Sequence, residues 1–172
     1  MIQTMDNSKV RLRSYEDDLY VSGTGIIIMG AWGVVKLLLG VFLGEDRDLF
    51  FEADSELGQT AAIILTTLMV GILSALIILL HVHIGLNAVR AARGKEYKKS
   101  YLIWNALLLL LNIVSFIGYY DMFDDMENID STIASILVDL TSVYVCLIVI
   151  ISANRIKKIK QVISGGEEDH AD

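Results

Sequence analysis

The 172-residue sequence contains no proline, a single cysteine and only three histidines. Proline interrupts helices because it lacks a backbone N–H and clashes with the preceding turn, so this cause of helix breaks is absent. Cys146 cannot form an internal disulfide by itself, and the cysteine spacings of zinc sites do not occur. These absences exclude a secreted disulfide scaffold, and Cys146 is expected to be a small packing residue.

Charged residues are also scarce. They make up 20% of the chain, against about 25% in soluble domains, whereas 54% of the residues are hydrophobic. The charges gather in short blocks between four long apolar runs, which excludes a soluble globular enzyme and a disordered chain. Each run reaches the roughly 20 residues that are needed to cross a bilayer. The predicted spans are about 19–43, 59–80, 101–120 and 132–153.

Each span is expected to be an α-helix, because a backbone in hydrocarbon must satisfy its own hydrogen bonds. The first run is longer than the apolar part of a signal peptide and is expected to be retained. The predicted fold is therefore an all-α integral membrane protein with four transmembrane helices in an antiparallel bundle. This domain, residues 19–153, would follow a cytoplasmic segment (1–18) and precede a basic, then acidic, cytoplasmic tail (154–172) with a flexible end at Gly165–Asp169.

The distribution of lysine and arginine predicts the orientation. Of 14 such residues, 12 occur in the N-terminal segment, the loop between the second and third spans, and the C-terminal segment. Because basic segments stay in the cytoplasm, both termini are predicted to be cytoplasmic in a plasma (inner) membrane. The net charge of −7 conceals this asymmetry, and no nucleic-acid partner is expected. The two outer loops hold 11 acidic residues, namely Glu45, Asp46, Asp48, Glu52, Asp54, Glu56, Asp121, Asp124, Asp125, Glu127 and Asp130.

Two charged residues interrupt the apolar spans. Lys36 and Asp139 each lie seven residues from the outer end of their helix, which places both roughly 10 Å below the outer boundary. Opposite charges at one depth can pair, which removes much of the cost of burying either one alone. Thr67 and Asn112 occur at the same depth in the other two spans. The sequence therefore predicts one buried polar layer, formed by Lys36, Thr67, Asn112 and Asp139.

Further small and polar residues recur at helical spacing in each span. Such stripes are typical of the faces that membrane helices turn toward each other. The glycines of the first span, among them Gly23, Gly30 and Gly33, would permit a close approach of a neighbouring helix. A secondary polar stripe is expected from Ser74, Asn105, Ser135 and Ser142.

The polar layer supports two interpretations. It is either a structural clip that locks the helices together or an ion or proton site, since ionisable residues inside membranes mark such pathways. No nucleophile shares its depth with a base inside the spans, so no enzymatic activity is expected. His81 and His83 point to different helix faces and His170 lies in the tail. No metal or cofactor is therefore expected, although ligation by His81 together with a non-histidine residue, or across a dimer, stays open.

The leading hypothesis is a small non-enzymatic membrane protein that acts through assembly, as an accessory, regulatory or immunity-type factor. Its expected partners are the lipid bilayer and either further copies of the chain or another membrane protein. The alternative is an ion channel or transporter that uses the layer between Lys36 and Asp139 and works as an oligomer.

Overall fold

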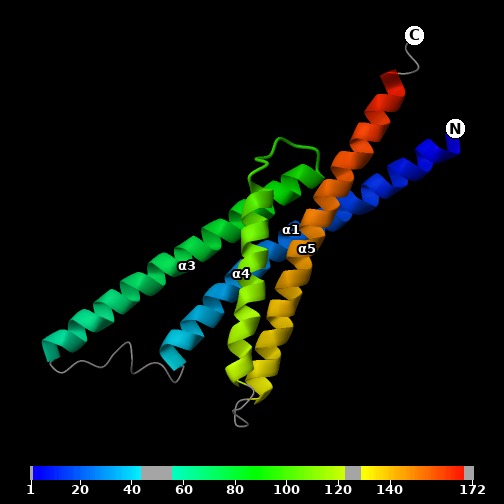
Figure 1. Cartoon of the computed structure of the whole chain (residues 1–172). Helices are drawn as coiled ribbons and strands as arrows, with labels where there is room; N and C mark the ends of the chain where they lie inside the picture. The colour runs from blue at the N-terminus through cyan, green and yellow to red at the C-terminus, as the bar shows by residue number, and fades with distance from the viewer. Residues whose placement is uncertain (1, 44–55, 123–128, 169–172) are drawn as a thin grey trace. The chain divides into compact units, whose positions relative to one another are not determined.

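A computed structural model of the chain describes residues 2–43, 56–122 and 129–168, and the regular structure in these ranges is entirely α-helical. Each predicted span lies within one helix, which confirms the all-α prediction (Figure 1). The described helices are α1 (Ile2–Leu43), α3 (Glu56–Ala92), α4 (Tyr101–Met122) and α5 (Ile129–Glu168).

Most of the predicted outer loops lie outside the described residues. The same holds for the third histidine and for the single basic residue of these loops. The residues concerned are Glu45, Asp46, Arg47, Asp48, Glu52, Asp54, Asp124, Asp125, Glu127 and His170.

The helices continue well beyond the predicted spans. α1 begins at Ile2 rather than near Leu19, and α5 continues past Ala153. The 40 residues of α5 extend about 60 Å, roughly twice the thickness of the hydrocarbon core. The prediction of a flexible end from Gly165 is wrong as far as Glu168, because hydropathy marks where an apolar run stops and not where helical hydrogen bonding stops.

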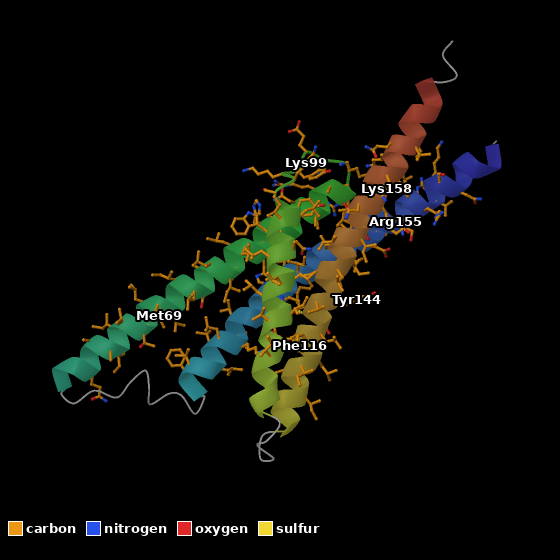
Figure 2. The ribbon with its side chains drawn as sticks, in the orientation of Figure 1. Met69, Lys99, Phe116, Tyr144, Arg155 and Lys158 are labelled. Atoms are coloured by element: carbon orange, nitrogen blue, oxygen red, sulfur yellow. The ribbon has the colours of Figure 1, made fainter. Side chains whose placement is uncertain are left out.

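Three of the described helices are long and apolar enough to cross a membrane. The stretches concerned are Asn7–Leu39, Gly58–Ala92 and Ser135–Ile163, and only 11% of the most apolar window of α3 is buried within the chain. The apolar stretch described in α4 is shorter, at Tyr101–Ile117, although all 22 residues of α4 extend about 33 Å. Met69 and Tyr144 are among the many exposed apolar side chains, as expected for helices surrounded by lipid (Figure 2).

The chain divides into two compact units. Unit 1 comprises Met1–Ile26 and Ile84–Asp172, which are the start of α1, the end of α3, and α4 and α5. Unit 2 comprises Ile27–His83, which holds the rest of α1 and α3. Within unit 1, α4 and α5 lie side by side (Figure 1). The buried residues of these two helices are Tyr101, Asn105, Leu108, Cys146, Val149, Ser152 and Ile156.

The end of α3 is fixed by a glycine turn. Gly94 has a φ of +66°, a left-handed conformation that side chains with a Cβ rarely adopt. Its N–H donates to the carbonyl of Ala91 at 3.2 Å, and the N–H of Lys95 donates to the carbonyl of Arg90 at 2.9 Å. These two bonds are those of a Schellman motif, which satisfies carbonyl groups left over at the helix end.

The connection from α3 to α4 is tied to α3 by a side chain. Asn87 is 5% exposed, and its carbonyl oxygen accepts a hydrogen bond from the backbone N–H of Lys98 at 3.0 Å. α4 then begins after Ser100, whose carbonyl accepts the N–H of Trp104 at 3.1 Å. The lysines of this connection are consequently held close to the helices of unit 1.

Candidate functional site

The four residues of the predicted polar layer divide between the two units. Lys36 and Thr67 belong to unit 2 and are exposed, whereas Asn112 and Asp139 belong to unit 1 and are half-buried. Lys36 and Asp139 each take part in polar or electrostatic interactions. The four-residue layer and the pairing of Lys36 with Asp139 stay predictions.

Within unit 1, a serine connects the levels of Asn112 and Asp139. The Ser115 hydroxyl donates to the carbonyl of Asn112 at 2.7 Å and lies 3.5 Å from Oδ2 of Asp139. A hydroxyl has one proton, so the short bond to the carbonyl leaves only a weak contact with the carboxylate. The Asn112 side chain turns back along its own helix and donates to the carbonyl of Leu108 at 2.8 Å. Ser115 lies one turn beyond Asn112 on the same helical stripe, so α4 brings this hydroxyl to the Asp139 carboxylate.

The most deeply buried polar contact joins α4 to α5. Asn105 is 0% exposed, and its amide donates to the backbone carbonyl of Cys146 at 2.9 Å. Asn105 meets residue 146 and Ser115 meets residue 139, so these two helices run in opposite directions. Cys146 is itself 2% exposed, which fits the packing role expected from its sequence position.

The remaining residues of the secondary stripe are less closely connected. Ser135 and Ser142 are half-buried on α5. Ser74 lies in unit 2, where its hydroxyl oxygen is buried without a hydrogen-bond partner among the described residues. The structure therefore joins only Asn105 of this stripe to a neighbouring helix through a described hydrogen bond.

Glycines of α1 bring it close to α3 in both units. In unit 1, a Cβ on Gly23 would lie 2.9 Å from Cβ of Ala88 and 3.0 Å from the carbonyl oxygen of Gly85. In unit 2, a Cβ on Gly30 would lie 2.5 Å from Cβ of His81. Both approaches are closer than any side chain permits, so the two glycines are required for these contacts.

His81 has a structural place in this packing. It is half-buried against Gly30, and its Nδ1 lies 2.8 Å from the carbonyl oxygen of Ile77 one turn earlier. Within the described parts of the chain, no group of three or more histidine, cysteine or carboxylate side chains could hold a metal ion.

The structure gathers the three basic segments at one end of unit 1. Figure 2 shows Lys99 of the α3–α4 connection at the same end as Arg155 and Lys158 of α5. Cavities at this end are lined jointly by basic residues of α1 and α5, of α1 and α3–α4, and of α3–α4 and α5. The segments that the lysine and arginine distribution predicts to share one side of the membrane are therefore neighbours in space.

One contact of this end could not be deduced from the sequence. The Arg93 guanidinium donates to the hydroxyl of Tyr20 at 3.0 Å and lies 4.8 Å from the centre of its ring. These residues are 73 positions apart in the sequence. The sequence indicated only that both lie near the cytoplasmic boundary of the predicted spans. The contact joins α1 to the end of α3.

No protein-family model matches this chain, and no curated protein and no solved structure gives a significant match either.

Proposed function

We propose that the chain is a non-enzymatic, four-span protein of the plasma (inner) membrane, with both termini in the cytoplasm. It acts through assembly in the bilayer, as an accessory, regulatory or immunity-type factor. The observation that carries this proposal is the outer part of α3, where Thr67 is exposed and a Cβ on Gly71 would meet nothing within 4 Å.

Thr67 and Gly71 are one turn apart, so they form a small, partly polar patch on an otherwise leucine- and isoleucine-rich helix. Lipid tails make few favourable contacts with such a patch, whereas a second helix can pack closely against it and form a hydrogen bond with the Thr67 hydroxyl. The sequence predicts that this stripe lies at a helix contact, and within unit 2 it is left open. A second copy of this chain is the occupant that we test.

The experiment measures the self-association of the parent protein and of two variants, both in mild detergent and in vesicles. Gly71→Leu fills the open space, so we expect the association constant to fall at least about fivefold, since one overpacked contact costs roughly 1–3 kcal/mol. Leu65→Trp is the control, because it adds bulk to an exposed residue that lies about 120° from Gly71 around α3. A parent protein that is monomeric at every concentration, or equal association of parent and Gly71→Leu, contradicts assembly through this face.

The orientation is supported by the clustering of the basic segments in unit 1. Positive residues remain on the cytoplasmic side, so the end that carries Lys99, Arg155 and Lys158 would face the cytoplasm. In this proposal α4 is the remaining membrane-spanning helix, besides the three long apolar ones. Its length of about 33 Å matches the thickness of the hydrocarbon core, about 30 Å.

A second candidate function is an ion pathway formed by several copies. The feature that favours it is the position of Lys36 within an apolar span, because ionisable residues inside membranes mark ion and proton pathways. Ion flux into liposomes tests this candidate with Lys36→Met and Asp139→Asn. Absence of flux in the parent, or unchanged flux in both variants, rules it out.

A further inference from the structure

The basic end of unit 1 contains a cavity of about 620 Å³. It is a partly open cavity, lined by residues of α1, the end of α3, the α3–α4 connection, the first turn of α4 and the late part of α5. Four lysines line it, two from the connection and two from α5: Lys95, Lys99, Lys157 and Lys160. Leu19 and Tyr101, each 1% exposed, form part of its apolar wall.

The charge of this cavity is of one sign. None of the described residues that line it is acidic. Lys160 is partly neutralised from outside, because its ammonium lies 3.2 Å from a carboxylate oxygen of Glu16. Four like charges around one space repel each other, and an anion placed among them relieves that repulsion.

The four lysines and the apolar wall of the cavity suit different parts of one molecule. Lysine ammonium groups bind phosphate as point charges, whereas the apolar wall offers nothing to a free inorganic ion. A lipid presents a phosphate joined to an apolar body, and basic cavities between membrane helices on the cytoplasmic side are suited to such headgroups. We propose that this cavity binds the phosphate headgroup of an anionic phospholipid from the cytoplasmic leaflet.

Binding at this cavity needs insertion in a bilayer but no second copy of the chain. The cavity is built wholly from unit 1, whereas the assembly face on α3 belongs to unit 2. A failure of lipid binding and a failure of assembly can therefore be told apart, because Gly71→Leu leaves every residue of the cavity unchanged.

The test measures the affinity of the full-length protein for phosphatidylglycerol in mixed micelles, with phosphatidylcholine as the neutral comparison. Each lysine near an anionic lipid surface contributes about fivefold to binding, so Lys95→Gln with Lys157→Gln should weaken phosphatidylglycerol binding about 25-fold. The control is Arg155→Gln with Lys158→Gln, which removes the same charge from residues that line a separate, smaller cavity of about 170 Å³. We expect the control to weaken binding clearly less than Lys95→Gln with Lys157→Gln, because its charges line a different cavity.

A second variant acts in the opposite direction and so does not depend on a loss of folding. Glu16→Gln removes the carboxylate that pairs with Lys160, and we expect it to tighten phosphatidylglycerol binding about two- to fivefold. Equal weakening by the two double variants overturns the proposal, and so does equal affinity for phosphatidylcholine. Displacement of the lipid by millimolar inorganic phosphate also overturns it, since the site would then hold a soluble anion.

Discussion

Asn105 is completely buried, and its side-chain amide donates a hydrogen bond to the backbone carbonyl of Cys146 across the contact between α4 and α5. Because the amide is fully buried between the helices, the bond fixes the register of α4 against α5. Asn112, one of the layer residues predicted from sequence, instead bonds within its own helix. Helical spacing placed both side chains on one stripe, but only the packing around each decides which of them crosses to the neighbouring helix.

Asn105→Ala should therefore destabilise the contact between α4 and α5. The loss of one interhelical hydrogen bond and of the packed amide predicts about 1–2 kcal/mol. Ser115→Ala is the control, because its short bond stays within α4 and its side chain is exposed. Unfolding in mixed micelles measures both changes, and equal losses for the two variants would contradict the role given to Asn105.

Gly94 has a backbone conformation that few other residues accept. Gly94→Ala should lower the free energy of unfolding by about 1 kcal/mol, because its φ of +66° strains any residue with a Cβ. Gly94→Asn should cost less, since asparagine tolerates this region better than alanine. Thermal unfolding of the two variants side by side checks the order, and a more stable alanine variant would disprove it.

At the scale of the element, the close approach of α1 to α3 in unit 2 depends on one glycine far more than on the next. Gly30→Ala would place its Cβ against His81, whereas Gly33→Ala would meet Ile77 at an ordinary 3.5 Å. We predict a loss of about 1–3 kcal/mol for Gly30→Ala and nearly none for Gly33→Ala. The free energy of unfolding of the two single variants in detergent measures the difference. Similar values for both would contradict the prediction, because α1 and α3 would then move apart at little cost.

The helices themselves were predictable from the sequence only in part. Their apolar centres were evident from length and hydropathy, and the absence of proline correctly predicted helices without interruption. Their ends were not evident, because the charged segment from Lys9 to Asp18 is as compatible with a helix as with a solvated coil. The contact of Arg93 with Tyr20 depends on how α1 and α3 meet, which no spacing within one helix reveals.

At the scale of the whole molecule, the proposed orientation can be measured directly. In a protein that carries Cys146→Ser, Lys98→Cys should make the chain react with a membrane-impermeant maleimide from the cytoplasmic side only. Asp125→Cys, in the loop proposed to lie outside, should give reaction from the other side only. Labelling of both positions from one side would refute the proposed topology.

The candidate site shows a similar division between what the sequence predicts and what it leaves out. The clustering of lysine and arginine from three distant segments follows from a rule about membrane sides, so it was foreseeable. The cavity that four of the lysines line was not foreseeable, because it forms only where α1, the α3–α4 connection, α4 and α5 come together. The apolar wall of Leu19 and Tyr101 comes from two helices that are far apart in sequence.

The unbroken course of α5 has a mechanical consequence. Asp139 and Lys157 are 18 residues apart, which is about five helical turns, so they lie on the same azimuth about 27 Å from each other. A stiff rod transmits rotation, so any turning of α5 at the level of Asp139 swings Lys157 through the same angle. One extra residue inserted between them would shift this phase by about 100° and carry the lysine off the cavity, whereas four extra residues would nearly restore it.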